Sequence, residues 1–161
     1  MKYAQELFDL VDNNRDILNP WMPWDPLSKT VDDIKKFIEG TLEWHKKKES
    51  MTFAIMYENS IVGVIGFNTI DSNLKKAILG YWLSKEYNGK GIMRKSCQRL
   101  IEYAFDALDV KKVEAYVANK NKKSRRVCEN LGFNLEGIIT NAQVLNGEIV
   151  DDAVYGIHSS N

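Results

Sequence analysis

The sequence predicts one α/β domain built on a mixed sheet with helices on its faces. Three observations lead to this fold class. Two helical patterns open the chain, runs rich in β-branched and aromatic residues follow, and a glycine loop then leads into a further helix. In order, the predicted elements read ααβββαβαββ, which is typical of helices packed on a sheet. With 161 residues, the chain is long enough to bury roughly two thirds of its unfolded surface as a single domain, 1–161.

Two helices and a hairpin are expected in the first half of the chain. Apolar residues recur at helical spacing over 3–18, and the proline-rich segment 20–26 then ends the helix. A threonine followed three residues later by an aspartate predicts the cap of a second helix over 30–47. The apolar runs 52–57 and 61–70 are separated by a polar turn, and together they predict a β-hairpin.

Six further elements are expected in the second half. They are a strand over 77–83, a helix from the glycine loop to about residue 108, a strand over 113–118, a helix over 121–130, and two strands over 133–145 and 148–157. A glycine at position 132 ends the second of these helices. Asn146-Gly147 is the strongest hairpin signal in the chain, because both residue types accept the positive φ of a tight turn.

The charge balance and the cysteines exclude several classes of protein. The chain carries 22 basic and 22 acidic residues, so no global charge attracts it to nucleic acid or to a membrane surface. Its longest apolar runs, such as 61–67, are too short to span a bilayer, and no signal peptide is expected. Cys97 and Cys128 fall in helical patterns without metal-ligand spacing. We therefore expect a cytoplasmic protein with reduced thiols, no metal, and no nucleic-acid or membrane partner.

A loop with two glycines, Gly89 and Gly91, lies between a predicted strand and a predicted helix. Glycine lets the backbone approach an anion closely, and a helix N-terminus offers free N–H groups, so we expect a phosphate-bearing ligand here. A dinucleotide fingerprint would need a glycine at Arg94 and an acidic residue near Lys111. A Walker loop would need another spacing and a hydroxyl residue after Lys90. Neither nucleotide motif fits.

Six segments of the chain resemble, in order and spacing, the GNAT N-acetyltransferases. They are Trp21-Met22-Pro23-Trp24, Gly80-Tyr81-Trp82-Leu83, Asn88 to Met93, Asn121-x-x-Ser124, Leu131-Gly132-Phe133, and Asn146-Gly147 followed by Asp151. Within that family, they look like the branch that acetylates the N-termini of ribosomal proteins. The likeness spans essentially the whole chain, so it is more specific than the loop alone. Taken by themselves, Gly89 and Gly91 could equally form a turn and a helix cap.

The resemblance implies a GNAT fold with a mixed, mostly antiparallel sheet, and acetyl-CoA as the co-substrate. Backbone N–H groups of 89–94 would hold the CoA pyrophosphate. The strand 81–83 would pair edge-on with the pantetheine arm and splay from the strand 113–118 to form a V-shaped cleft. By this resemblance, the cofactor-binding residues are Tyr81, Trp82, Leu83, Asn88, Gly89, Lys90, Gly91, Ile92, Met93, Arg94, Asn121 and Ser124.

Several of the implied roles have a plainer structural alternative. Ser124 would act in catalysis by hydrogen-bonding the CoA sulfur, or it is a capping or solvated serine. Many relatives carry a tyrosine for this purpose where Cys128 stands, and we expect Cys128 to pack in the core. Arg94 would pair with the pyrophosphate or lie in solvent. Trp21 and Trp24 would form a wall for the acceptor or pack in the core.

Direct transfer of an acetyl group needs a base, and the carboxylates that the resemblance leads us to expect are absent. Ile78 and Gln143 stand where related enzymes carry glutamates. Freeing a lysine amine at pH 7 costs about 4.6 kcal/mol, whereas an α-amine costs about 1.1 kcal/mol, so a site without a strong base favours an α-amine. Asp71, at the end of the predicted hairpin, is the first candidate for a substitute catalytic base.

The resemblance predicts an acetyl-CoA-dependent N-acetyltransferase that acts by direct attack of an amine, either a protein N-terminus or a small amine. The alternative is a CoA-binding regulatory or catalytically degenerate domain, which the missing glutamates favour. The family begins with a strand before its first helix, whereas Met1 here lies close to that helix. We therefore expect the first strand to be missing, through a truncation or a start codon placed late. The edge left exposed would invite a homodimer.

Overall fold

The computed structural model describes residues 3–22 and 28–160, and its elements follow the predicted order. They are α1 (Ala4–Asp12), α2 (Arg15–Leu18), α3 (Val31–Lys46), β1 (Met51–Tyr57), β2 (Ser60–Asp71), β3 (Lys76–Leu83), the 3-10 turn η2 (Lys85–Tyr87), α4 (Ile92–Ala107), β4 (Lys112–Ala118), α5 (Lys122–Asn130), β5 (Asn134–Leu145) and β6 (Glu148–His158). The predicted α/β fold class is confirmed, and the first predicted helix is divided in two.

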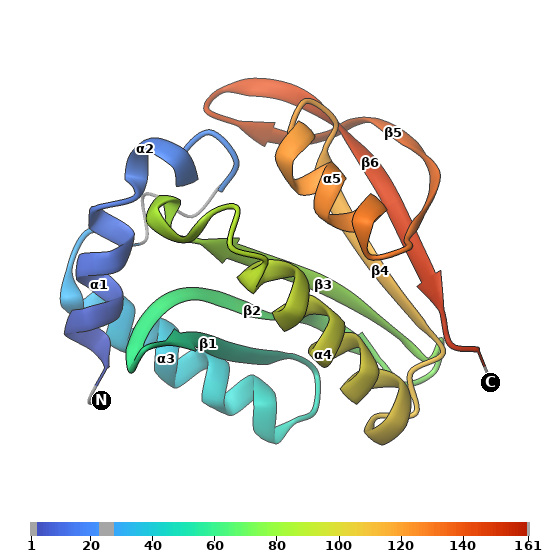
Figure 1. Cartoon of the computed structure of the whole chain (residues 1–161), viewed down its shortest axis with the longest axis horizontal. Helices are drawn as coiled ribbons and strands as arrows, with labels where there is room; N and C mark the ends of the chain where they lie inside the picture. The colour runs from blue at the N-terminus through green and yellow to red at the C-terminus, as the bar shows by residue number, and fades with distance from the viewer. Residues whose placement is uncertain (1–2, 23–27, 161) are drawn as a thin grey trace.

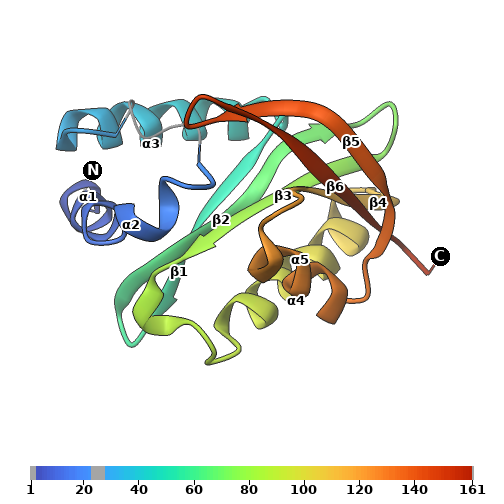
Figure 2. The same cartoon turned by 90° about the horizontal axis from the view of Figure 1, so that it is seen from above.

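One six-stranded sheet runs through the molecule in the order β1-β2-β3-β4-β6-β5. Only the neighbours β3 and β4 are parallel, so the sheet is mixed and mostly antiparallel, as predicted. Helices α1 and α3 cover one face, and α4 and α5 cover the other (Figure 1 and Figure 2). The sheet therefore separates two hydrophobic clusters, one under each pair of helices.

The two halves of the sheet part where β3 meets β4. These strands pair only from Lys76–Ile78 to Lys112–Glu114. Beyond that point, β3 pairs only with β2 and β4 only with β6, so the two strands diverge (Figure 1). The V-shaped splay predicted between them is confirmed. It leaves the backbone of 79–83 without a strand partner on the β4 side.

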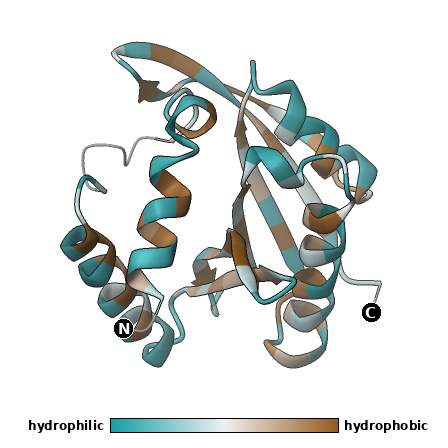
Figure 3. Ribbon diagram, turned by 60° about the vertical axis from the view of Figure 1, so that its left-hand side comes forward, coloured by the Kyte–Doolittle hydropathy of each residue, from teal (hydrophilic) through white to brown (hydrophobic). Residues whose placement is uncertain are grey.

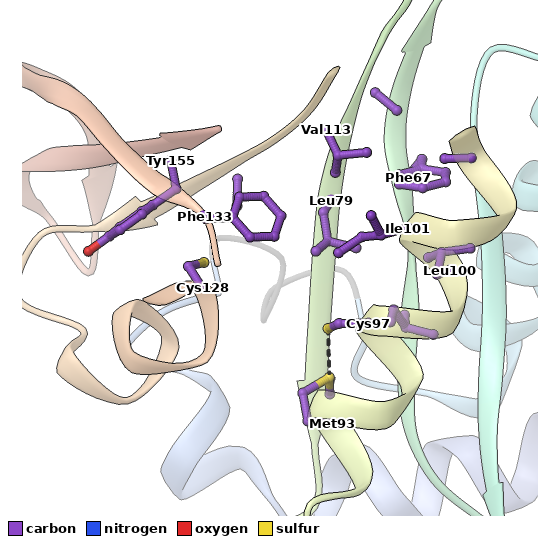
Figure 4. Packing of buried hydrophobic residues seen from close by; sticks show 14 of the residues in the cluster. Phe67, Leu79, Met93, Cys97, Leu100, Ile101, Val113, Cys128, Phe133 and Tyr155 are labelled. Carbon is purple, nitrogen blue, oxygen red and sulfur yellow. Dashed lines mark hydrogen bonds between the residues drawn. The ribbon is translucent and has the colours of Figure 1, made fainter. Parts of the chain in front are cut away.

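The main core lies between the sheet and the two later helices. Phe67, Leu79 and Val113 from the strands pack against Leu100 and Ile101 from α4 (Figure 4). The buried residues of α4 recur at helical spacing, and Figure 3 shows apolar and polar residues alternating around the helices. A smaller cluster joins α1 and α3 to the other face of the sheet. The two clusters therefore pack the splayed strands from both faces of the sheet.

The break in the predicted helix 3–18 coincides with a buried asparagine. Asn14, between α1 and α2, is 2% exposed, and its side-chain amide bonds two backbone groups. Its Nδ2 donates to the Leu10 carbonyl at 2.8 Å, and its Oδ1 accepts from the Lys85 N–H at 2.9 Å. Burial of an amide requires such partners. Asn14 therefore ends α1 and anchors it to the segment that precedes the glycine loop.

The predicted turn and cap residues adopt the conformations that their types favour. Thr30 and Asp33 form a capping box at the start of α3. Asn146 and Gly147 both have positive φ, 52° and 81°, in the turn between β5 and β6. These local signals set the start of one helix and the register of the last hairpin.

β1 forms one edge of the sheet. The expectations of a missing first strand and of a homodimer stay predictions. Within 3–22 and 28–160, no helix is long and apolar enough to cross a membrane.

Candidate active site

A cleft of about 990 Å³ opens at the splay between β3 and β4. Phe37 from α3 lines it on one side, Tyr81 and Trp82 line it from β3, and 115–118 line it from β4. The last hairpin contributes Gln143 and Asp152. Both halves of the sheet and the helices over its first half therefore meet at one cavity.

The glycine loop leads from η2 into α4. Gly89 and Gly91 have φ values of 78° and 74°, in the left-handed region that L side chains disfavour. A Cβ at either position would meet no atom within 4 Å, so the backbone angle, rather than space, requires glycine. Gly91 is the N-cap of α4, and no side chain caps this helix end. The N–H groups of the first turn are therefore available to an anion.

The side chain of Lys90 is held beside two aromatic rings. Its ammonium lies 4.7 Å from the ring centroid of Tyr87 and 5.8 Å from that of Tyr57. Cation–π contacts at exposed sites contribute about 0.5–1 kcal/mol, enough to orient the side chain without burying its charge. The loop therefore carries a positive charge in a defined place.

The other predicted residues of the loop divide between solvent and core. Asn88 and Arg94 are exposed, and Ile92 is half-buried. Met93 is buried in the main core, where the Cys97 thiol donates to its sulfur at 3.6 Å (Figure 4). The side chain of Met93 thus anchors the first turn of α4, and the backbone of the turn faces the loop.

Tyr81, Asn121 and Ser124 come together at the cleft. Asn121 is the N-cap of α5, and its Oδ1 accepts from the Ser124 N–H at 3.2 Å. The Tyr81 hydroxyl donates across the splay to the Ser124 carbonyl at 3.1 Å and lies 3.7 Å from Cys128 Sγ. Burial raises the pKa of Tyr81, so this hydroxyl stays protonated. In the described part of the chain, the hydroxyl of Ser124 itself has no hydrogen-bond partner.

Trp82 and Leu83 are held by packing. Trp82 lines the cleft and packs against the cluster under α1 and α3, whereas Leu83 lies in the main core. Their side chains position β3. What β3 offers to an extended ligand is therefore its unpaired backbone on the β4 side.

Of the two predicted tryptophans of the acceptor wall, Trp21 lines the cleft, and Trp24 lies outside the described residues. The role of Trp21 as an acceptor wall stays a prediction. Cys128 is fully buried and packs in the core near Phe133 and Tyr155, as expected (Figure 4).

Asp71 lies at the turn between β2 and β3. Its Oδ1 accepts from the N–H groups of Asn73 and Leu74, both at 2.9 Å. Such a side chain stabilises a turn by replacing a backbone acceptor. Asp71 does not line the cleft, and its role as a base stays a prediction.

Asp33 and Asp152 are the carboxylates that line the cleft among the described residues. Oδ2 of Asp33 accepts from both the N–H and the hydroxyl of Thr30 in the capping box of α3. Asp152 is 6% exposed and accepts a hydrogen bond from Gln143 Nε2 at 2.8 Å. Reasoning from the sequence missed Asp152. The turn at 146–147 predicts that 143 lies opposite 150, but neither the register shift that follows nor the burial of Asp152 can be read from that turn.

A buried carboxylate closes the narrow end of the V. Glu114 on β4 is 5% exposed and accepts from Lys76 at 3.0 Å and from Lys112 at 2.7 Å. The Tyr116 hydroxyl, which belongs to a cleft-lining residue, donates to it at 3.2 Å. Burial alone would raise the pKa of Glu114, but the hydrogen bonds from the two lysines bring it below its usual range. Glu114 is therefore ionised, and its charge is balanced by Lys76 and Lys112.

No group of His, Cys, Asp and Glu side chains suited to a metal ion occurs within the described ranges. The described site thus has two parts, a cleft between parted parallel strands and a glycine loop that follows β3 in the chain and opens α4.

The comparisons with known proteins agree with this feature. Residues 2–134 match the family model described as the acetyltransferase (GNAT) domain. The ribosomal-protein-serine acetyltransferase of Escherichia coli (strain K12) is 28% identical over 153 residues, covering 95% of this chain and 86% of the relative. The class defined by fold and site is therefore that of the N-acetyltransferases. This chain belongs to the GNAT acetyltransferase family.

Two solved structures share the fold closely. The microcin C7 self-immunity acetyltransferase MccE, in complex with acetyl-CoA and AMP, has a TM-score of 0.95 and 32% identity, covering 98% of this chain and 88% of its own. The ribosomal L7/L12 α-N-protein acetyltransferase RimL, in complex with coenzyme A, has a TM-score of 0.94 and 27% identity, with 98% and 89% coverage.

Proposed function

We propose that this N-acetyltransferase uses acetyl-CoA and transfers the acetyl group to an α-amine at the N-terminus of a protein. The observation that carries the proposal is the single cleft that joins the unpaired edge of β3 to a pocket between the last hairpin and α3. The end along β3 suits an extended thioester, and the end between the last hairpin and α3 leaves room for the N-terminus of an acceptor protein. The ribosomal-protein acetyltransferases among the relatives support this choice of acceptor.

The residues of the glycine loop fit the pyrophosphate of CoA. The uncapped first turn of α4 offers several N–H groups and the positive end of the helix dipole. Lys90 adds a positive charge beside them. The pantetheine arm would then lie along 79–83, where its amide groups could form hydrogen bonds with backbone groups that are not paired with β4.

Ser124 would meet the sulfur at the far end of this path. Its backbone is fixed on both sides, by Asn121 through the N–H and by Tyr81 through the carbonyl. The hydroxyl is left without a partner in the described structure and lines the cleft. It would donate a hydrogen bond to the thiolate as the C–S bond breaks, which lowers the barrier to departure.

The energetics of amine deprotonation favour an α-amine over a lysine side chain. At pH 7 the neutral form costs about 1.1 kcal/mol for an α-amine and about 4.6 kcal/mol for lysine. The cleft offers one buried carboxylate that no cation neutralises among the described residues, which suits the easier deprotonation. Small amines of low pKa would fit the same reasoning.

A peptide panel tests the proposal. Thiol release from acetyl-CoA would be followed with peptides that have a free N-terminal serine or alanine, with N-blocked peptides that contain lysine, and with small amines. We expect the free N-termini to react at least about 100-fold faster than the blocked lysine peptides. Faster reaction of the lysine peptides would contradict the proposal.

A CoA-binding regulatory or degenerate domain is the alternative, because neither Ile78 nor Gln143 can act as a base. In that case, acetyl-CoA would raise the melting temperature, yet no amine of the panel would release thiol. A melting temperature raised by ATP or NAD instead would refute both functions.

We also infer that the protein works in the cytoplasm. Cys97 and Cys128 are buried free thiols, as is usual for a reducing compartment. An N-terminus on a ribosomal protein would be met in the same compartment.

A further inference from the structure

Asp152 is an unusual carboxylate for a position so well buried. It is 6% exposed, and buried acidic side chains are almost always paired with a cation. In the described structure, its only hydrogen bond comes from the neutral amide of Gln143, to Oδ1 at 2.8 Å. No ion pair involves it within those residues. From the residues that the structure describes, its second oxygen, Oδ2, accepts no bond, and Asp152 lines the cleft.

The other acidic groups near the cleft are already engaged. Asp33 caps α3 through Thr30, and Glu114 is neutralised by Lys76 and Lys112. Of the two described carboxylates that line this cavity, only Asp152 is buried, and none of the described residues forms an ion pair with it. A buried negative charge that opens on a cleft is satisfied by a cationic ligand, and an ammonium group provides one with three donors.

The pairing of the last hairpin explains how Asp152 is held. Gln143 pairs with Val150, and after a register shift in β5 Asp152 pairs with Ile139, so the Gln143 amide reaches Asp152 diagonally across the hairpin. On its other side, Asp152 lies opposite Ala118, at the open end of β4. The amide of Gln143 holds Oδ1, and both side chains belong to residues that line the cleft. Gln143 cannot take a proton itself, so its part is to position.

We propose that Asp152 receives the ammonium group of the acceptor and takes one of its protons, and that Gln143 positions it. This inference rests on the proposed function. It identifies the general base and the acceptor end of the cleft, and it makes a primary amine the ligand that this end recognises.

The proton balance of the step is simple. The acceptor ammonium gives one proton to Oδ2 of Asp152 and becomes a neutral amine. The nitrogen lone pair forms an N–C bond with the thioester carbonyl, and the C–S bond then breaks, leaving CoA thiolate. The nitrogen loses its second proton to the thiolate, which gives an amide and free thiol. The proton on Asp152 passes to water when the product leaves.

Binding of the acceptor without acetyl-CoA tests the first half of the proposal. The probes are a short peptide with a free N-terminal serine and the same peptide with an acetylated N-terminus, measured by calorimetry. The Asp152→Asn change keeps the shape of the side chain and its contact with Gln143 but removes the charge. We expect it to weaken binding of the free peptide about tenfold or more and to leave the acetylated peptide unaffected. Equal affinity of wild type and variant for the free peptide would overturn the proposal.

Acetyl transfer tests the second half. Asp152→Asn should lower kcat by about 100-fold or more, with the affinity for CoA unchanged. The double variant Gln143→Glu, Asp152→Asn exchanges the amide and the carboxylate across the same 2.8 Å contact. We expect it to recover at least tenfold of the lost kcat, which a purely structural role of Asp152 would not produce.

Asp106→Asn, at an exposed position on α4, is the matched control and should react as wild type. If the Asp152→Asn variant has the melting temperature of wild type and keeps full kcat, Asp152 is not the general base. If wild type transfers acetyl to no amine, the proposed function fails, and the calorimetric comparison still decides whether Asp152 binds an ammonium group.

Discussion

Single side chains determine what the cleft can do, and their hydrogen bonds distinguish structural roles from available groups. Asp71 and Asp33 each use one oxygen to hold the local backbone, Asp71 Oδ1 in a turn and Asp33 Oδ2 in the cap of α3, and neither is buried. Asp152 and Ser124 are held by neighbours and each keep one polar group free at the cleft. A carboxylate that is buried at the cleft without a cation is thus a stronger catalytic candidate than one that holds an exposed turn or cap.

Replacing Asp71 by alanine tests this distinction. The change removes two hydrogen bonds of the turn between β2 and β3, so we expect the free energy of unfolding to fall by about 1–2 kcal/mol. Chemical denaturation measures the loss. A 100-fold loss of kcat in the folded variant would restore Asp71 as the base and would count against Asp152.

At the scale of elements, the cleft depends on where hydrogen bonding stops. β3 and β4 share three residue pairs and then part, and α4 starts at a glycine without a side-chain cap. Both features leave backbone groups unpaired at the surface, a cost that native proteins avoid unless a partner uses them. The thioester arm and the pyrophosphate are partners of suitable length and charge in the proposed function.

Gly91→Ala tests the loop. The left-handed φ of 74° disfavours a side chain by about 1–2 kcal/mol, so the variant should be less stable and bind CoA more weakly. Gly40→Ala is a matched control within α3, where a Cβ meets nothing within 4 Å, and we expect it to gain about 0.5–1 kcal/mol. Calorimetry with CoA and thermal unfolding measure both effects. Unchanged CoA affinity in Gly91→Ala would remove the loop from the binding site.

At the scale of the whole molecule, two half-sheets are joined at the closed end of the V. Glu114 links Lys76 of β3 with Lys112 of its own strand, and Lys112 also pairs with Glu136 of β5 at 2.7 Å. The charges sit where the two halves last touch. Breaking this network should let the halves move relative to each other and change the width of the cleft.

The network makes a pH-dependent contribution to stability. Because the folded pKa of Glu114 lies below its unfolded value of 4.5, its stabilisation is present above pH 4.5 and is lost as the pH falls through the folded pKa. We expect Glu114→Gln to cost about 3 kcal/mol at pH 7 and to flatten the fall in stability below pH 4.5. Urea titrations at several pH values measure this, and an unchanged acid dependence in the variant would contradict it.

Most of the elements could be predicted, because their signals are local. The capping box at Thr30, the turn at Asn146-Gly147 and the spacing of apolar residues in α4 each depend on residues close in sequence. The break at Asn14 could not, because the amide leaves the helix for the N–H of Lys85, 71 positions away. The candidate base was missed for a similar reason, since its burial depends on several strands at once.

The sequence by itself determined the order of the elements, the fold class, and the family likeness carried by the glycine loop and its companion motifs. These follow from periodicity, caps and turns, whose energies are set within a few residues. Only the tertiary structure decided where β3 and β4 part, and which carboxylate is buried at the cleft without a cation among the described residues. Those features depend on burial and on hydrogen bonds between segments far apart in the chain, so a local sequence pattern cannot predict them.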